Sequence, residues 1–297
     1  MPTVQNLLDN YLSNIDILGE GMPVWFNARR SDAAAALNLH GLPNAKQECY
    51  LHSNIARLLE GEWEQYFVAR RHPAPKELLP EADASRIELI NGRTANNNLK
   101  ISIEGAVYGS LRAAACSEKY GALVEKWLDS AADINDTPTA LTRMFVQDGA
   151  FVYLPEGVEE QSPILIDNFY HAEGEDELCF SQLLVIAEKG ACAEVIITHR
   201  SAGDGRIFAG VTREAVIGEG ADIHFTELYD LQQNCSIVNN NYIEQAEASH
   251  CSTMSCKTGD GYVRAAYNSA LKAPEAVSNV WALYLCGGKE HCDLNLA

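Results

Sequence analysis

Two pairs of adjacent residues combine the side chains that bind metals most readily. His250 is followed by Cys251, and His291 is followed by Cys292. Imidazole nitrogen and thiolate sulfur are common ligands of zinc, copper and iron–sulfur clusters. Neighbouring residues on a β-strand point to opposite faces, so neither pair can hold one ion without a bend or further ligands from another strand or subunit. We predict His291 and Cys292 as the metal-ligating pair; a hydrogen-bonded histidine beside a buried thiol is the competing interpretation.

The sequence lacks the local signatures of common catalytic sites. It contains no GxxxxGK[ST] phosphate loop, no HExxH zinc motif and no GxSxG nucleophile elbow. The GxG pairs at 203–205 and 218–220 lack the third glycine of the dinucleotide fingerprint. The acidic residues at 173–177 fall in an expected turn, where solvation keeps carboxylates from acting as an acid–base pair. We therefore expect no catalytic residues.

The composition is that of a globular protein with a large negative charge. Of 297 residues, 22 are Lys or Arg and 41 are Asp or Glu, which gives a net charge of -19. Such a surface repels polyanions, so nucleic acid and anionic membranes are not expected partners. The N-terminal segment MPTVQNLLDN does not resemble a signal peptide, and no apolar run is long enough to span a membrane. Nine cysteines, an odd number without a secretion signal, argue against a disulfide framework and predict a cytoplasmic protein.

Residues 1–84 are predicted to form a helical region followed by a linker. The apolar residues near the N-terminus have the spacing of an amphipathic helix. Gly41-Leu42-Pro43 provides a helix stop, and three prolines within residues 72–84 indicate a linker. The expected helices cover residues 4–15, the stretch from Pro23 to the Gly41 stop, and about 53–67.

From about residue 85 the pattern changes to short extended runs separated by turns. Asn91-Gly92 is typical of a tight hairpin turn. Strands are expected on either side of it, at 86–90 and 99–103, and one helical insertion is expected at about 110–131.

Two later segments repeat each other and indicate the fold. Ala187-Glu-Lys-Gly-Ala191 and Ile217-Gly-Glu-Gly-Ala221 each precede a strand, and Gly190 and Gly220 are 30 residues apart. This period predicts a mainly β fold, a right-handed parallel β-helix over residues 85–297. An antiparallel sandwich has strands at similar spacing and stays open as an alternative.

Several stretches from residue 41 onward resemble the SufB/SufD family of the SUF iron–sulfur cluster assembly machinery, closest to its SufD branch. The most specific is Asp148-Gly-Ala-Phe-Val-Tyr-Leu-Pro-Glu-Gly157 after the helical LVEKWL, which resembles the family's DGxFxYxPxG passage. Its residues suit turns and one strand face, so they are expected to be structural. The other matching segments are Gly41-Leu-Pro43 with Glu48 and Tyr50 (usually Trp in the family), Arg86–Arg93, Leu184–Ala191, and Glu290-His291 with Asp293.

The resemblance implies a non-catalytic scaffold that works with a SufB-like sister subunit and a SufC-like ATPase. It implies no stably bound cofactor, and an iron–sulfur cluster only transiently in the full complex. In the family, further β coils and a C-terminal helical region follow the segment that EHCD matches. We expect this chain to lack them, together with much of the partner interface. An open end of paired strands makes a homodimer an additional expectation.

Two other classes of protein stay open on the sequence alone. The first is a carbohydrate-active enzyme, because β-helices also host such enzymes and fold does not fix function. The second is a metal-binding β protein that uses His250, Cys251, His291 and Cys292.

Overall fold

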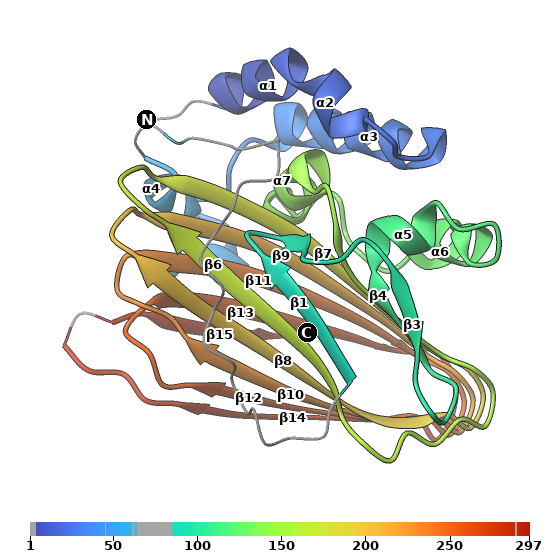
Figure 1. The fold of residues 1–297 in the computed structure, drawn as a ribbon. Coiled ribbons are helices and arrows are strands. Elements are labelled where there is room, and N and C mark those ends of the chain that lie inside the picture. The colour runs from blue at the N-terminus through green and yellow to red at the C-terminus, as the bar shows by residue number, and fades with distance from the viewer. Residues whose placement is uncertain (1–3, 45, 61–62, 64–84, 289) are drawn as a thin grey trace.

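Two mostly parallel sheets, joined coil by coil, form the solenoid of the computed structural model (Figure 1). The structure describes residues 4–44, 46–60, 63, 85–288 and 290–297. About five solenoid turns run from residue 149 to 296, and each contributes one strand to each sheet. The strands of successive turns pair in parallel, which confirms the predicted solenoid and rules out the antiparallel sandwich.

The seven-stranded sheet has the order β14-β12-β10-β8-β6-β1-β2 and the eight-stranded sheet the order β15-β13-β11-β9-β7-β5-β4-β3. The solenoid strands of the first are β6 Ile164–Ala172, β8 Cys192–Gly203, β10 Asp222–Asp230, β12 His250–Lys257 and β14 Val277–Tyr284. Those of the second are β5 Gly149–Leu154, β7 Glu177–Ala187, β9 Ile207–Ile217, β11 Cys235–Gln245, β13 Tyr262–Leu271 and β15 Cys292–Leu296.

Each coil of the solenoid contains one tight turn in which a residue adopts the left-handed backbone conformation. In the first four of these turns the backbone N–H of that residue donates to a carbonyl of the next coil, for example Gly190 to Glu219 at 2.9 Å. The φ angles are +69° at Gly157, +66° at Gly190, +63° at Gly220, +53° at Ala248 and +61° at Glu275. The Gly-Ala repeat that the sequence analysis identified at Gly190 and Gly220 therefore belongs to a longer series of left-handed turns. The later turns have Ala248 and Glu275 in place of glycine.

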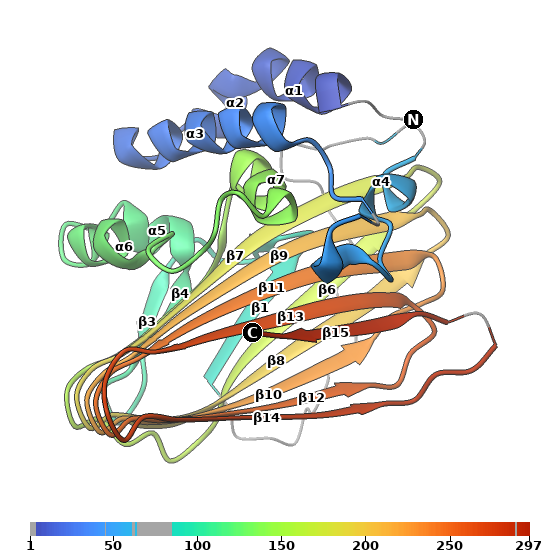
Figure 2. The same cartoon turned by 180° about the vertical axis from the view of Figure 1, so that it is seen from behind.

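The two sheets differ in what covers their outer faces. Strand β10 alternates between inward buried and outward exposed residues, as a sheet with one wet face should. Strand β7 is buried along its whole length, because helices pack on the outside of the eight-stranded sheet. Figures 1 and 2 show these helices as a layer on that side of the solenoid.

Helix α7, Thr137–Phe145, is the inner part of this layer and was not predicted. Phe145 stacks on Phe180 of β7 with ring centroids 5.5 Å apart, and the other side of α7 contacts α3. The helix is buried on all sides, so it lacks the polar face by which a surface helix is recognised.

The N-terminal helices agree with the prediction in part. The expected helix over 4–15 is divided at Asn14 into α1 Val4–Ser13 and α2 Ile15–Gly19. Helix α3, Val24–His40, begins after Pro23 and ends at Gly41, which has a φ of +69°. The 3₁₀ turn Glu48–Tyr50 and α4 Ile55–Leu58 follow. Of the helix expected at 53–67, residues 61, 62 and 64–67 lie outside the described residues. The linker expected at 72–84 also lies outside them.

The regular coil begins later than expected. Strand β1, Ser85–Ile90, pairs in parallel with β6, and the Asn91-Gly92 turn joins it to the short β2, Arg93–Thr94. The next two strands run antiparallel to their neighbours: β3, Leu99–Ile101, and β4, Val107–Ser110. The helical insertion expected at 110–131 is two short helices, α5 Leu111–Ala115 and α6 Gly121–Trp127. No helix among the described residues is long and apolar enough to cross a membrane.

We call residues 85–127, which precede the regular coils, the irregular entry. Asp148 of the DGAFVYLPEG passage links it to the solenoid. Its carboxylate accepts hydrogen bonds from the backbone N–H groups of Thr94 and Arg112, at 3.1 and 3.0 Å, and from the hydroxyl of Ser110 at 2.8 Å. Phe151 and Tyr153 lie on one strand face, and both rings contact Tyr120. The passage therefore has the structural role predicted for it.

The left-handed turns give a matched pair of substitutions. Gly220→Ala should lower the free energy of unfolding by about 1 kcal/mol, because the left-handed region is unfavourable for a residue with a Cβ. A Cβ at residue 220 would meet nothing within 4 Å, so the effect is conformational. Ala248→Gly should raise the same quantity by about 0.5 kcal/mol. Urea unfolding followed by circular dichroism measures both, and shifts of the same sign would contradict this account of the turns.

Candidate functional site

The predicted metal-ligating pair lies at the entry to β15, where its two side chains diverge. The ring of His291 stacks on Tyr262 with centroids 4.3 Å apart, and its Nε2 lies 3.5 Å from the Ser53 hydroxyl. Burial lowers the pKa of His291. Cys292 packs instead against the apolar interior of the solenoid, and burial raises the pKa of its thiol to about 12.

The second pair diverges in the same way. Cys251 is buried in the interior, and burial raises the pKa of its thiol to about 12. His250 lies on the outer face, with its Nδ1 3.7 Å from a carboxylate oxygen of Asp222. Within the described ranges, no three His, Cys, Asp or Glu side chains are grouped so that they could hold a metal ion. The metal site at His291 and Cys292 stays a prediction that would need ligands from outside this set.

The structure gives the His291–Asp293 segment a different role, which is to dock the segment that precedes α4. Ser53 donates its hydroxyl hydrogen to the carboxylate of Asp293. Arg264 of β13 has its Nε 3.8 Å from the same carboxylate, and its guanidinium lies 4.0 Å from the centroid of the Tyr50 ring. Two segments that carry the family resemblance are thus joined across 240 residues of sequence.

Tyr50 extends this contact to α7. Its hydroxyl donates to Asp136, which also accepts from Asn240 of β11 at 2.6 Å. Burial, followed by the neighbouring Asp136 charge, raises the pKa of Tyr50, and burial also raises the pKa of Asp136. We call Tyr50, Ser53, Asp136, Arg264 and Asp293 the docking cluster, because these residues hold the N-terminal segment, the helical layer and the last strands together.

A second group of polar residues lies inside the solenoid and was not found from the sequence. Glu227 of β10 is fully buried, and its carboxylate accepts hydrogen bonds from Tyr267 and from Asn239, the latter at 2.8 Å. His199 Nε2 lies 3.7 Å from this carboxylate, and Arg213 Nη1 lies 4.0 Å from it. We call these five residues the interior cluster.

Neighbouring groups keep the buried Glu227 ionised, but its partner Arg213 lacks hydrogen bonds. Burial by itself would raise the pKa of Glu227, but Arg213, His199 and Tyr267 together lower it to about 2. The guanidinium nitrogens of Arg213 have no hydrogen-bond partner among the described residues, although the group lies over the ring of Phe225 at 4.2 Å. Arg213 is therefore held in the cluster by electrostatics and cation–π contact, whereas Glu227 is also held by hydrogen bonds.

Aromatic rings continue this cluster along the solenoid axis. Tyr170, His199 and Tyr229 occupy successive turns of the seven-stranded sheet, and their rings stack with centroids 6.1 and 4.9 Å apart. The Tyr170 hydroxyl lies 3.0 Å from His199 Nδ1. The sequence signal that could have identified the group is a charged residue at an inward position of a strand, which requires a partner inside the core.

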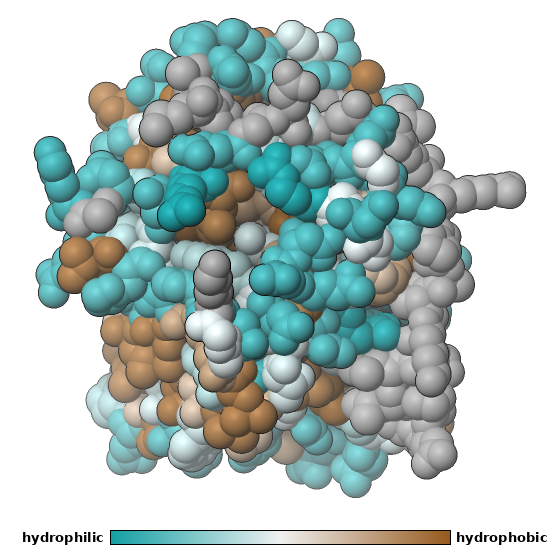
Figure 3. All heavy atoms as spheres, turned by 90° about the vertical axis from the view of Figure 1, so that its left-hand side faces the viewer, coloured by the Kyte–Doolittle hydropathy of each residue, from teal (hydrophilic) through white to brown (hydrophobic). Residues whose placement is uncertain are grey.

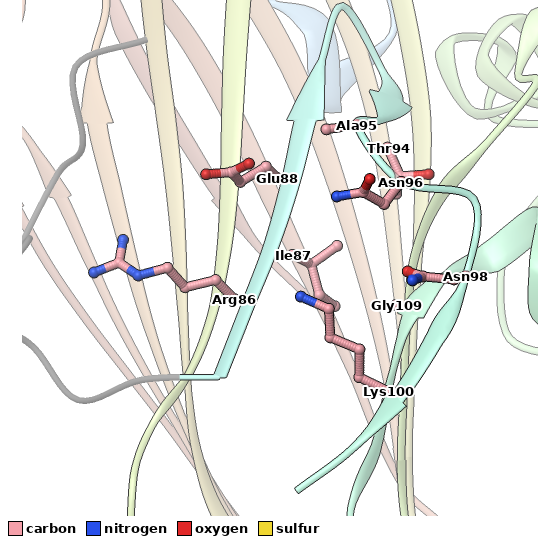
Figure 4. Close-up of a pocket in the computed structure, with 9 residues that line it drawn as sticks. All are labelled: Arg86, Ile87, Glu88, Thr94, Ala95, Asn96, Asn98, Lys100 and Gly109. Atoms are coloured by element: carbon pink, nitrogen blue, oxygen red, sulfur yellow. The ribbon is translucent and has the colours of Figure 1, made fainter. Parts of the chain in front are cut away.

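Two surface hollows that border the strands are further candidates; a third, of about 740 Å³, lies among the N-terminal helices between Tyr11 and Ser31. One, of about 210 Å³, lies between β1 and the β3–β4 ribbon (Figure 4). Ile87 points into it beside Asn98 and Lys100, whereas Arg86 and Glu88 point to the other side of β1. The other, of about 480 Å³, is an open groove beside Trp127 of α6 and the solenoid turns. The second contains an ion pair, in which Nζ of Lys272 lies 3.1 Å from a carboxylate oxygen of Glu244; both side chains are partly exposed, as in an ordinary surface ion pair.

The interior cluster predicts a strong effect from a small change. Glu227→Gln should lower the free energy of unfolding by about 3–5 kcal/mol, because it leaves the buried Arg213 without its opposing charge. The exposed Glu219, which pairs with Lys189 at 2.7 Å, provides the control, and Glu219→Gln should change the stability by less than about 1 kcal/mol. Equal effects in urea unfolding would contradict the role given to Glu227.

The same group should make the protein sensitive to acid. The pKa of Glu227 is about 2 in the folded protein against an ordinary 4.5, so its stabilising effect is complete above pH 4.5 and is lost as the pH falls toward 2. Glu227→Gln should therefore flatten the stability curve between these values. Chemical unfolding at a series of pH values measures this, and an unchanged slope would count against it.

The docking cluster predicts a local effect. Asp293→Ala should release the segment around Ser53 and raise the amide exchange rates of residues 47–58 about tenfold or more, because Ser53 loses its hydrogen-bond acceptor and Arg264 loses its ion-pair partner. Asp230→Ala, at an exposed position on β10, is the matched control and should leave these rates unchanged. Hydrogen exchange with mass spectrometry reads both, and unchanged protection in Asp293→Ala would overturn the assignment.

Comparison with protein families accounts for nearly the whole chain. Residues 1–166 match the SufBD protein N-terminal region, and residues 169–297 match the SUF system FeS cluster assembly SufBD core domain. A search of curated proteins found no match. The core match coincides with the regular turns of the solenoid, and the N-terminal match covers the helical layer and the irregular entry. The chain therefore belongs to the SufB/SufD family, whose members are subunits of the SUF iron–sulfur cluster assembly system.

Proposed function

We propose that this chain is a SufD-type, non-catalytic scaffold subunit that works in the cytoplasm with a SufB-like sister subunit and a SufC-like ATPase. The family match supports an assembly subunit over the carbohydrate-active alternative. The SufD-type assignment is supported by the motif resemblance from residue 41 onward.

The state of the interior thiols is the observation that carries the scaffold role. Cys235 and Cys251 are buried between the sheets, and burial raises the pKa of each thiol to about 12; it also raises the pKa of Cys179. The thiolate is the form that attacks electrophiles and binds iron. These thiols stay protonated at neutral pH, so they act as small apolar side chains of the core. In this role iron and sulfide are cargo that the chain helps to position within the complex.

The docking cluster supports the same role in a second way. It joins the helical layer to the β13–β15 end of the solenoid, so the two parts can transmit force to each other as one body. An ATPase that rearranges its neighbouring subunits needs such stiff parts to act on.

Co-expression tests this proposal. With a SufB-like subunit and a SufC-like ATPase, the chain should elute from size exclusion as one complex, and ATP hydrolysis should depend on the ATPase subunit alone. After anaerobic incubation with iron and sulfide, the chain alone should retain no cluster absorbance, whereas the complex should acquire it.

Two controls separate this result from its alternatives. A cluster or zinc ion held at unit stoichiometry by the chain alone, and lost in Cys292→Ser, would overturn the scaffold role in favour of the metal-binding alternative. Light scattering of the chain alone distinguishes a monomer from the homodimer that an open sheet end allows; a dimer that excludes the SufB-like subunit would contradict the proposed partnership.

A further inference from the structure

The groove of about 740 Å³ among the N-terminal helices lies between α2 and the first half of α3. Figures 1 and 2 show these helices as the outermost part of the helical layer. Three large apolar side chains line the groove and are exposed: Ile15 and Ile17 of α2, and Val24 of α3, which is 87% exposed. On the side face in Figure 3, apolar residues lie side by side with hydrophilic ones. Apolar side chains gathered around one hollow mark an interaction surface.

The α3 side of the groove has the shape that receives another helix. Val24, Ala28 and Ser31 line it and follow each other at i, i+4 and i+7, so they lie along one face of α3. Ala35 continues this face and is also exposed. From Val24 to Ala35 the face is about 16 Å long, which is three turns. Side chains as small as alanine and serine let a second helix approach closely.

Hydrogen bonds fix the groove before any partner arrives. Arg30 of α3 is buried, and its guanidinium donates to the carbonyls of Leu18 at 3.1 Å and of Met144 at 3.2 Å. The side-chain amide of Asn27 donates to the carbonyl of Gly19 at 3.2 Å. These bonds tie α3 to the end of α2 and to α7. A partner therefore binds a preformed surface and loses less entropy in ordering it.

One polar group in the lining has no partner. Tyr11 of α1 is 2% exposed, and its hydroxyl has no hydrogen-bond partner among the described residues. The Tyr11 ring packs edge-on against Phe145 of α7, with centroids 6.4 Å apart. Buried hydroxyls in folded proteins almost always form a hydrogen bond. The Tyr11 hydroxyl is therefore a group that an occupant of the groove can satisfy.

The charges around the groove indicate the charge of its occupant. Asp16 and Glu20 line it and are exposed. Arg30, the one cation among the described lining residues, is buried and donates to backbone carbonyls. The chain as a whole has a net charge of -19, so it repels a second copy of itself and favours a positively charged partner.

We propose that the groove between α2 and α3 docks a basic amphipathic helix of a partner protein. The apolar face of that helix packs against Ile15, Ile17 and Val24, as in other complexes in which a helix binds a groove. Its lysine or arginine side chains flank this face and pair with Asp16 and Glu20. The contact is separate from the docking cluster and from the interior cluster, so binding leaves the solenoid unchanged.

The experiment measures fluorescence anisotropy of a labelled peptide of about 18 leucine and lysine residues, with leucines on one helical face, bound to the full chain. A peptide of the same composition, with leucines spread around the helix, should bind at least about tenfold more weakly. Val24→Asp should weaken binding of the first peptide about tenfold, because it places a charge in the apolar contact. Ala28→Trp should weaken it similarly by filling the groove.

Leu39→Asp is the matched control, because Leu39 is an exposed residue of α3 outside the groove. Both aspartate variants add one negative charge, so charge attraction alone would tighten the binding of both. Leu39→Asp should leave the affinity within about twofold. Circular dichroism checks that the variants are folded, and Val24 is the first residue of α3, where an aspartate is favourable.

The charge of the groove is tested separately. Asp16→Asn combined with Glu20→Gln should weaken binding about fivefold at low salt, and this difference should disappear at about 0.5 M salt. Glu156→Gln combined with Glu219→Gln removes two exposed charges outside the groove and should have less than about a twofold effect. Absence of binding to the wild-type chain would refute the proposal. Equal binding of the two peptides, or equal affinities of Val24→Asp and Leu39→Asp, would refute it as well.

Discussion

The structure depends on one constraint: the backbone N–H and C=O groups of each solenoid strand must find their partners in the coil before or after it. Parallel pairing meets this requirement only if successive coils have nearly the same length and the same bend, so the chain returns to its starting point about every 30 residues. The left-handed residues at Gly190, Gly220, Ala248 and Glu275 mark that return. The alternation of side chains along each strand then decides which residues point into the solenoid interior and which point outward.

This constraint also decides where chemistry can and cannot occur. A strand that alternates sends one member of each His-Cys pair inward and the other outward, as at Cys292 and His291. Inward thiols stay protonated because burial outweighs the nearby positive charges, such as Arg213 near Cys251. Glu227 lies in the same interior and is ionised because Arg213 and His199 surround it. The interior therefore holds the charge of Glu227 because opposite groups from neighbouring coils meet it there.

Sequence patterns identify the repeating part of this fold better than its exceptions. The Gly-Ala turns and the Asn91-Gly92 turn depend on local backbone conformation, which glycine and asparagine signal directly. Helix α7 was missed because burial on all sides removes its polar face. The regular coil begins later than expected because β3 and β4 form an antiparallel hairpin, and β4 pairs antiparallel with β5 across the helical insertion. The charged residue at an inward position, Glu227, could have been noticed in the sequence, but the partners within the docking and interior clusters could not be predicted, since they come from different coils and meet only once the coils are stacked.

The contact between Ser53 and Asp293 has a consequence for how the protein is made. The two residues are separated by 240 positions, and a ribosome that adds about 5–20 residues per second needs roughly 10–50 seconds to cover that distance. During this interval the segment around Tyr50 has been synthesised without the strands that receive it, and its apolar surface is open to chaperones. The helices can form early, but this segment reaches its native position only after β15 has left the exit tunnel.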